Sequence, residues 1–249
     1  MIQKNTIDVI IIAKNEASRI ASCMSGVAWS NHIIVIDNDS TDETAGIARK
    51  NGAHVIKSST DNFSELRELG ARSAQSEWLF YLDADESVTI ELRDEILKIV
   101  RNQADFDAYT LPRKNYYLGF PWPYRDGMVR LLKKDSLTSW AGKLHESAVV
   151  QGNVGKLKNY VIHTTHRNLE EMVDKTNIWS SAEAGLRFDK EHPPVVWWRF
   201  LRVMFTGFWS SFITQNGWKA GTVGWIESMY QGFSMFITYA KLWELQQKQ

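Results

Sequence analysis

One short stretch constrains the fold of this chain more than any other, because an apolar run in it ends abruptly in acidic residues. Residues 78–82 read Trp-Leu-Phe-Tyr-Leu, and Asp83, Ala84, Asp85 and Glu86 follow directly. A run of this kind is typical of a strand buried on both faces of a sheet. Because open α/β sheets bind ligands at the carboxyl ends of their strands, the acids mark a candidate binding site.

Asp83 and Asp85 are two residues apart, so their side chains point to the same side if the extended conformation continues that far. Two carboxylates held together repel each other unless a positive group lies between them, and a divalent cation commonly fills that place. The stretch alone leaves two interpretations open, a metal site or an acidic turn that caps the next helix. Glu86 is expected at the start of that helix.

The sequence on both sides predicts alternating strands and helices with short connections. Strands are expected at residues 7–13, 33–36, 53–57 and 78–82, and helices at residues 16–25, 41–51, 63–74 and 90–102. This order is typical of an α/β fold with a doubly wound, mostly parallel sheet. Further strands are expected at residues 107–113, 126–133, 144–150 and 159–163, a loop at residues 115–125 and a long helix at residues 169–188.

Composition excludes several classes of protein. Lys+Arg and Asp+Glu both number 29, and the resulting net charge of zero argues against a general nucleic-acid-binding protein. The single cysteine, Cys23, excludes an intrachain disulfide framework and a cysteine-only zinc site. The sequence contains neither the Walker pattern nor G-x-G-x-x-G, so a bound nucleotide would be held by carboxylates and a metal rather than by backbone amides.

The last quarter of the chain is aromatic and helical in pattern, and six of the 11 tryptophans fall there. This segment either forms a helical cap over the sheet or lies in a membrane interface, with Trp and Tyr at the level of the lipid headgroups. Residues 195–249 contain five Lys or Arg residues and two Glu residues, and this positive excess favours binding to an anionic membrane leaflet. No stretch reaches the roughly 18 to 20 apolar residues that a membrane-spanning helix needs, and no signal peptide is expected.

Acidic residues follow three of the expected strands. Glu16 follows the first strand, Asp37 and Asp39 follow the second, and Asp83 and Asp85 follow the fourth. A parallel sheet brings these strand ends to one edge. Such clustering is unfavourable unless the site binds a cation or hydrogen-bond donors, such as ribose hydroxyls and a base N–H.

Three motifs resemble the signatures of family 2 inverting glycosyltransferases with the GT-A fold. They are Ile-Ile-Ala-Lys-Asn-Glu at residues 11–16, Asp-Asn-Asp-Ser-Thr-Asp-Glu-Thr at residues 37–44 and Leu-Asp-Ala-Asp-Glu at residues 82–86. The match covers about the first 110 residues, in order and at suitable spacing. It implies a GT-A fold that binds a nucleotide sugar, followed by an acceptor-side extension and the C-terminal aromatic helical segment.

The same resemblance implies roles for individual residues. Glu16 and Asp39 are expected to contact the uridine, and Asp83 the ribose. Asp85 is expected to bind a Mg²⁺ or Mn²⁺ ion on the diphosphate of the sugar nucleotide. Arg67 matches a basic position that often faces the nucleotide.

The second half of the chain is similar to a narrower group, the small bacterial glycosyltransferases that add β-1,4-glucose to heptose in the inner core of lipopolysaccharide or lipooligosaccharide. The matching residues are Asp-Gly-Met-Val-Arg-Leu at residues 126–131, the stretch from Trp140 through His145-Glu146, and His163. This similarity implies a UDP-sugar as donor and a lipid-linked bacterial glycan as acceptor; it does not fix the sugar, for which glucose is our expectation. It also implies a cytoplasmic protein that is peripheral on the inner face of the cytoplasmic membrane.

Glu146 is the best-placed carboxylate outside the nucleotide motifs. Inverting transfer needs a base that takes the proton of the acceptor hydroxyl, so Glu146 is the candidate catalytic base, with Asp126 in reserve. His163 is a candidate metal ligand or diphosphate contact, and equally a structural histidine. Arg130 and Lys175 are candidates to neutralise the departing diphosphate, although a solvated helix face explains Lys175 as well.

These assignments divide the chain by role. Residues 1–110 are expected to bind the nucleotide sugar, residues 111–190 to bind the acceptor and carry the base, and residues 191–249 to form an amphipathic helical segment at the membrane interface. The main hypothesis is a metal-dependent inverting glycosyltransferase. One alternative is a polyprenyl-phosphate sugar synthase, whose anionic acceptor needs no base. The other is a non-catalytic membrane-surface module that binds a sugar nucleotide.

Overall fold

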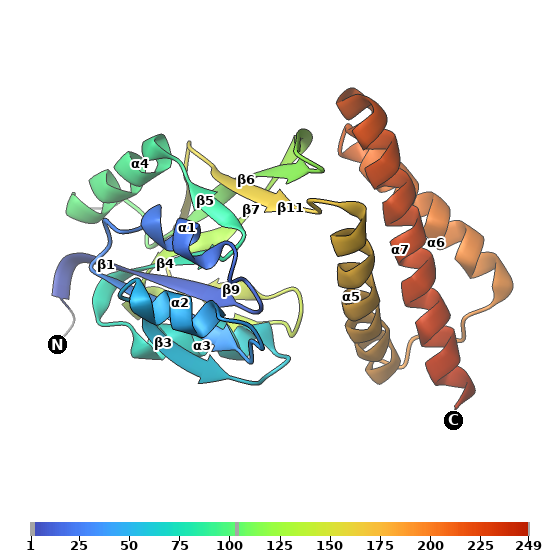
Figure 1. The fold of residues 1–249 in the computed structure, drawn as a ribbon, viewed down its shortest axis with the longest axis horizontal. Coiled ribbons are helices and arrows are strands. Elements are labelled where there is room, and N and C mark those ends of the chain that lie inside the picture. Colours follow the sequence, from blue (N-terminus) through green and yellow to red (C-terminus); the bar gives the residue numbers. More distant parts are fainter. Residues whose placement is uncertain (1–2, 103–104, 249) are drawn as a thin grey trace. The chain divides into compact units, whose positions relative to one another are not determined.

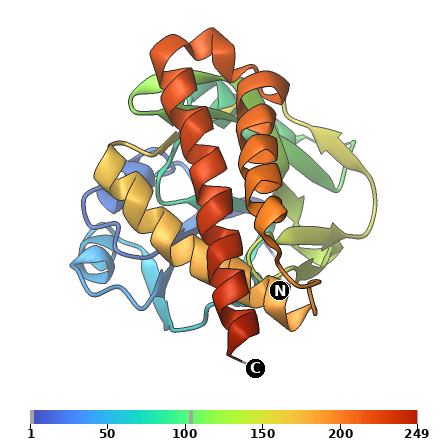
Figure 2. The same cartoon turned by 90° about the vertical axis from the view of Figure 1, so that its right-hand side faces the viewer.

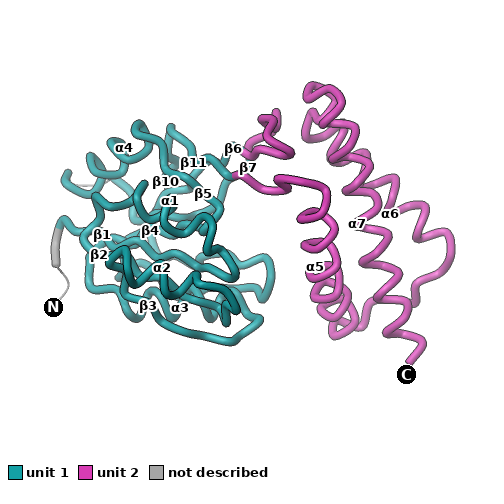
Figure 3. The backbone as a smooth tube through the Cα atoms, in the orientation of Figure 1, with its two compact units in different colours: residues 1–114, 126–163 teal, residues 115–125, 164–249 magenta. Residues whose placement is uncertain are grey.

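The computed structural model describes residues 3–102 and 105–248, so residues 1, 2, 103, 104 and 249 of the predicted ranges lie outside it. The chain forms two compact units, which Figure 3 shows in different colours. Unit 1 comprises Met1–Lys114 and Asp126–His163, and unit 2 comprises Asn115–Arg125 and Thr164–Gln249. The sequence divides the chain at residues 110 and 190 by expected role and not by compactness, so that division stays a prediction.

Unit 1 is built on a large sheet with the strand order β3-β2-β1-β4-β7-β6-β11-β5, and β10 lies beside β6 (Figure 1). Parallel pairing joins the first four strands, whereas β7 continues the sheet antiparallel to β4. The bounds of these five strands are β1 Gln3–Ala13, β2 His32–Asn38, β3 His54–Ser58, β4 Ser76–Asp83 and β7 Phe120–Lys133.

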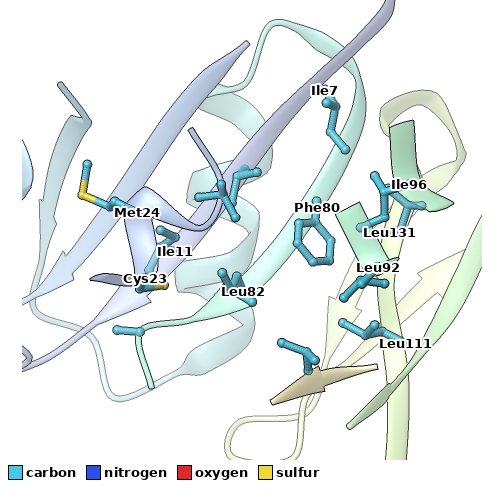
Figure 4. Packing of buried hydrophobic residues seen from close by; sticks show 14 of the residues in the cluster. Ile7, Ile11, Cys23, Met24, Phe80, Leu82, Leu92, Ile96, Leu111 and Leu131 are labelled. Carbon is cyan, nitrogen blue, oxygen red and sulfur yellow. The ribbon is translucent and has the colours of Figure 1, made fainter. Parts of the chain in front are cut away.

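Helices cover both faces of the sheet in unit 1. Side chains of three helices join the apolar cluster on one face, and those of α3 join the cluster on the other. The first three are α1 Ile20–Ser25, α2 Thr44–Lys50 and α4 Ile90–Arg101, and α3 spans Phe63–Ser73. Figure 4 shows the first cluster, in which Phe80 of β4 lies near Leu92 of α4 and Ile11 of β1 lies near Cys23 of α1. The predicted GT-A arrangement, a doubly wound and mostly parallel α/β sheet, is confirmed.

Strand β4 is buried on both faces, as its apolar composition predicts. Trp78, Phe80 and Leu82 belong to one apolar cluster, and Leu79 and Tyr81 belong to the other. Successive side chains of a strand point to opposite faces, and this period of two explains the division. The strand therefore fixes the direction of the residue that follows, because the next side chain in an extended chain points to the Tyr81 side.

A buried carboxylate lies near the amino-terminal ends of β2 and β4, away from the strand ends that carry the acidic motifs. The sequence did not single it out. Asp8 of β1 is fully buried and accepts hydrogen bonds from the backbone N–H groups of Gln75 (2.7 Å) and Ser76 (3.0 Å). The Ser76 hydroxyl donates a third bond at 2.6 Å. Burial alone would raise the pKa of Asp8, but these bonds to its charged form outweigh burial and lower the pKa.

Residues 115–125 differ from expectation. Residues 115–125, expected as a loop, lie in a hairpin in which β6 (Ala108–Tyr117) runs directly into β7. Leu118 and Gly119 form the connection, with φ values of +51° and +82°. Positive φ at both central residues is what a two-residue hairpin turn requires, because it matches the twist of the flanking strands. The sequence lacks the usual Asn-Gly or Asp-Gly signal, so the turn was missed.

Short elements complete unit 1. Strand β5 follows the acidic stretch and pairs antiparallel with β11, while β8 and β9 form a separate two-stranded ribbon. The bounds are β5 Glu86–Val88, β8 Leu137–Ala141, β9 Ser147–Val150, β10 Val154–Lys156, β11 Val161–Thr165 and a 3₁₀ turn at Lys134–Ser136. The strands expected at residues 144–150 and 159–163 correspond to β9 and β11, with shifted ends.

The part of unit 2 that follows β11 is helical, which confirms the predicted C-terminal aromatic helical segment. Its helices are α5 Leu169–Asp189, α6 Trp197–Trp209 and α7 Gly221–Gln247, with a π-helical turn at Ser210–Thr214 and a 3₁₀ turn at Gly217–Ala220. Figure 2 shows α6 (orange) alongside α7 (red). The helices approach closely at Gly232, where an added Cβ would lie 2.9 Å from the carbonyl oxygen of Met204.

Helix α6 of unit 2 exposes a continuous apolar face. Trp197, Leu201 and Phe205 are 74%, 63% and 61% exposed, and their spacing of four residues places them on one side of the helix. Val203, on the opposite side, is buried in the helical core with Tyr239 of α7. Among the described residues, no helix is long and apolar enough to span a membrane.

Candidate active site

The loops that follow β1 and β2 are bonded to each other at the carboxyl edge of the sheet. The Asn15 N–H donates to Ser40 Oγ at 2.9 Å, and Asn15 Oδ1 accepts the Thr41 N–H at 2.8 Å. The Glu16 N–H donates to Thr44 Oγ1 at 2.8 Å. These polar residues of the first two motifs therefore hold the two loops together.

Glu16, Asp37 and Asp39 lie at this edge, as the strand pattern predicts. The Glu16 carboxylate pairs with Arg19, whose Nη2 is 2.8 Å from Oε1. Asp39 is exposed and has a φ of +55°, a conformation that Asp tolerates better than most residues. Asp37 is 1% exposed, and its Oδ1 atom has no hydrogen-bond partner among the described residues. A buried acceptor without a partner suits a ligand that brings an N–H or O–H donor.

The strand geometry of β4 ends at Asp83, and Ala84 and Asp85 form a turn. The condition for both acids to point to the same side is therefore not met. Asp83 follows the alternation of the strand toward the face that carries α3, whereas Asp85 pairs with a residue of β11. The two acids have different partners because the turn separates their directions.

Asp83 is held by two buried arginines. Arg130 of β7 forms a bidentate pair with it, at 2.6 Å from Nη2 to Oδ2 and 3.2 Å from Nη1 to Oδ1. Arg67 of α3 donates a further bond to Oδ1 at 3.2 Å. Burial would raise the pKa of Asp83, but the positive charges of Arg130 and Arg67 outweigh it and hold the pKa well below its usual range. Asp83 is thus an anion at neutral pH.

Asp85 and His163, the two predicted metal ligands, lie side by side. Nε2 of His163 is 3.3 Å from Oδ2 of Asp85, and both side chains are mostly buried. Strand β11 supplies His163, and the turn after β4 supplies Asp85. A carboxylate oxygen and an imidazole nitrogen suit Mn²⁺, and a carboxylate suits Mg²⁺, so the residues present fit the expected cation. Within residues 3–102 and 105–248, no group of three His, Cys, Asp or Glu side chains is placed to hold a metal, so ligand oxygens would have to complete the coordination.

Glu86 does not begin a helix, so that expectation is wrong. It lies in β5 and is 2% exposed, and its Oε2 accepts the backbone N–H of Asp83 at 2.9 Å. Burial, followed by the charge of Asp83, raises the pKa of Glu86. Helix α4 begins later, where Thr89 Oγ1 accepts the Leu92 N–H at 3.2 Å. Glu86 therefore orders the turn that presents Asp85.

Asp126, the reserve candidate for the base, is engaged by an arginine that the sequence analysis did not single out. Arg113 Nη2 is 2.5 Å from Asp126 Oδ2, and Arg113 Nη1 is 3.7 Å from Oε1 of Glu86. Arg113 lies inside β6, and nothing in its local sequence distinguishes it from a solvated strand residue. Only the fold shows that it connects two of the acids.

Glu146, the candidate base, lies on the wall of a pocket of about 260 Å³. Its Oε1 accepts hydrogen bonds from Nε of Arg67 at 2.7 Å and pairs with Nη2 of the same residue at 2.6 Å. Unit 1 supplies the whole lining, Thr110, Gly127, Met128, Val129, Trp140, Glu146, Ser147 and Ala148. The structure thus joins Glu146 through Arg67 to Asp83, on the nucleotide side predicted from the motifs.

Other predicted residues belong to unit 2. Lys175 lies on α5 and pairs with Glu171 at 3.5 Å. Trp122, in the segment expected as a loop, is 3% exposed, and its Nε1 donates to Gln215 Oε1 at 3.1 Å. Trp122 is therefore a packing residue, whereas Tyr124 is 43% exposed.

Comparisons with known proteins show the family of this chain. A family model described as glycosyl transferase family 2 matches residues 8–155. An uncharacterised glycosyltransferase of Rickettsia prowazekii is 29% identical over 97% of this chain and 88% of its own. The lipopolysaccharide core biosynthesis glycosyltransferase LpsC of Rhizobium meliloti is 24% identical over 98% and 94%. Residues 1–349 of S. aureus TarS, solved in complex with UDP, are 14% identical over 98% of this chain and 92% of that chain, with a TM-score of 0.47.

Proposed function

Because this chain belongs to glycosyl transferase family 2 and is a glycosyltransferase, we propose that it transfers a sugar, most specifically glucose, from a UDP-sugar to a lipid-linked bacterial glycan such as the lipopolysaccharide core. The observation that carries the proposal is a network of ion pairs at the carboxyl edge of the sheet. Asp83, on the nucleotide side, and Glu146, beside a pocket, share one arginine, Arg67. A donor side and an acceptor side in direct contact are what a transfer reaction needs.

The donor is proposed to lie along the carboxyl edge of the sheet. Glu16 and Asp39 contact the uridine, and the partnerless Asp37 Oδ1 adds an acceptor for a base N–H. Asp83 contacts the ribose with the lone pair that its arginines leave open, since a carboxylate offers about four acceptor sites. UDP suits this edge better than a nucleotide held by backbone amides, because carboxylates accept bonds from ribose hydroxyls and the uracil imide.

Asp85 and His163 are proposed to hold a Mg²⁺ or Mn²⁺ ion together with the diphosphate of the donor. When bound, the ion supplies positive charge to the leaving group, which favours departure of UDP. Arg130 is buried at the same edge and is proposed to add fixed positive charge toward the diphosphate, whereas the role expected for Lys175, which belongs to unit 2, stays a prediction. His163 reaches the site because β11 pairs with β5, directly after the acidic turn.

Glu146 is proposed to be the catalytic base. Its carboxylate takes the proton of an acceptor hydroxyl, and the hydroxyl oxygen attacks the anomeric carbon from the side opposite the diphosphate. The bond from the anomeric carbon to the phosphate oxygen breaks, and UDP departs with the electron pair. The product therefore has the inverted anomeric configuration. The pocket beside Glu146 is large enough to hold one sugar ring of the acceptor.

The exposed face of α6 supports a membrane-surface location for the acceptor reaction. Arg199 and Arg202 lie on the same helix, with their guanidinium carbons 5.5 Å and 5.9 Å from the ring of Trp198. Aromatic rings with flanking cations are typical of helices that lie in the headgroup region of an anionic leaflet. We infer that the protein is cytoplasmic and peripheral on the inner face of the membrane, where a lipid-linked acceptor is available.

A polyprenyl-phosphate sugar synthase is the alternative, because the same membrane face would serve a lipid phosphate acceptor. That acceptor is already an anion and needs no base. The two enzymes differ in their response to Glu146→Gln, measured as sugar transfer to a crude lipid extract with radiolabelled UDP-glucose. Transfer that falls at least about 100-fold supports base catalysis. Transfer that continues at the wild-type rate favours the synthase.

A further inference from the structure

Arg67 occupies an unusual place for a surface-helix arginine. It lies on α3, is 2% exposed and joins two carboxylates from distant parts of the chain. Nε and Nη2 both point at Oε1 of Glu146, at 2.7 Å and 2.6 Å, and Nη2 also reaches Oδ1 of Asp83 at 3.2 Å. Oε2 of Glu146 makes no hydrogen bond to a described residue. The arginine therefore holds one carboxylate oxygen and leaves the other available.

Two aromatic residues fix the guanidinium in this position. Its central carbon lies 5.1 Å from the ring centroid of Trp140 and 5.7 Å from that of Tyr81, which allows cation–π attraction. The Tyr81 hydroxyl donates to the carbonyl oxygen of Arg67 at 3.1 Å, and Trp140 Nε1 donates to the same hydroxyl at 3.3 Å. Side chain and backbone of Arg67 are thus both held, so its orientation is set before any ligand arrives.

We propose that Arg67 is a positioning residue for the candidate base Glu146, beyond its expected contact with the nucleotide. It anchors Oε1 so that Oε2 points toward the pocket and takes the proton of the acceptor hydroxyl. Through Asp83 it also ties the position of the base to the nucleotide side of the site. This inference rests on the proposed function, because it assigns Arg67 a part in the same transfer.

A lysine at position 67 would keep the charge but not the geometry. An ammonium group is a point charge, whereas the guanidinium presents Nε and Nη2 to one acceptor and Nη2 to a second in a fixed plane. Arg67→Lys should therefore leave the base charged but poorly oriented. Misplacement of a reacting group by about 1 Å can lower a rate about 100-fold, so we expect kcat to fall about 10- to 100-fold.

The test uses the full chain with UDP-glucose and Mn²⁺, in a hydrolysis assay in which water takes the place of the acceptor. Arg67→Lys is expected to lower kcat while the Kd for UDP-glucose, measured by calorimetry, changes less than about threefold. In a Glu146→Gln background the same substitution should change the residual rate little, because Arg67 acts through Glu146. If Arg67→Lys folds poorly, Tyr81→Phe replaces it as the test variant, because it removes the hydroxyl that donates to the Arg67 carbonyl oxygen. Tyr81→Phe should also lower kcat, by a smaller factor.

Arg72→Lys is the matched control. Arg72 lies on the same helix and pairs with Glu68 at 3.0 Å, but its side chain is 77% exposed. Its substitution should leave both kcat and Kd unchanged. A loss in UDP-glucose affinity that accounts for the whole effect of Arg67→Lys would overturn the inference, as would an unchanged kcat or an equal loss with and without Glu146. A wild-type protein that neither binds nor hydrolyses UDP-glucose would instead contradict the proposed function, and the inference with it.

Discussion

The exposed face of α6 allows a quantitative prediction about membrane binding. Full burial of a Leu or Phe side chain is worth about 1.5–3 kcal/mol, and Trp197, Leu201 and Phe205 each keep more than half of their surface exposed. Each residue would then contribute about 1–2 kcal/mol on entering the interface, or about 3–6 kcal/mol together. Since 1.4 kcal/mol corresponds to a factor of ten, replacing all three by Ser should weaken vesicle binding at least about 100-fold.

The assay is co-flotation of the protein with vesicles of phosphatidylglycerol and phosphatidylethanolamine. Ile90→Ser provides a matched control, because Ile90 is 66% exposed at the start of α4 in unit 1 and should not contribute. Binding should also weaken with added salt, because Arg199 and Arg202 attract the anionic headgroups. Wild-type protein that does not float with the vesicles, or a triple variant that floats as well as wild type, would contradict membrane binding through this face of α6.

Three further predictions follow from single residues. Asp37→Asn should weaken UDP binding about tenfold without loss of thermal stability, because it removes the negative charge and replaces one carboxylate oxygen, in a group whose buried Oδ1 has no partner among the described residues, by a donating NH2 group; equal UDP affinity in calorimetry would contradict this. The pKa of Asp8 is lower in the folded protein than in the unfolded chain. Its ionised carboxylate therefore stabilises the fold at pH values above the unfolded-state pKa of about 3.9, and this stabilisation is lost as the pH falls through the pKa of the folded protein. The Tm of Asp8→Asn should therefore be lower than that of wild type at neutral pH, and the gap should narrow in acid; a gap that does not depend on pH would refute it. Gly232→Val should lower the Tm, because its side chain would meet the backbone of α6 at Met204; an unchanged melting curve would contradict the close helix contact.

Local signals in the sequence account for the sheet and for the position of the acids. The apolar run of β4 is continuous, and its alternate residues Phe80 and Tyr81 fill opposite faces, so composition alone predicts burial on both sides. The acids after β1, β2 and β4 come to one edge because parallel strands end together. These features depend on residues that are neighbours in the sequence or repeat with a fixed period.

The pairings inside the site depend on residues that are far apart in the chain. Arg67 and Glu146 are 79 residues apart, and Arg130 and Asp83 are 47 apart, so no local pattern connects them. The turn after Asp83 was missed for a related reason. Glu86 bends the chain back by accepting the Asp83 N–H, and that bond depends on the pairing of β5 with β11.

The most direct test of the account is the configuration of the glucose released when the protein hydrolyses UDP-glucose, in which the sugar is α-linked. Proton NMR of the first product distinguishes the β anomer from the α anomer before they interconvert. We predict that β-glucose appears first, that Mn²⁺ or Mg²⁺ is required, and that Asp85→Asn abolishes the reaction. Release of α-glucose first, or full activity of Asp85→Asn in the presence of a metal chelator, would contradict an inverting, metal-dependent transfer.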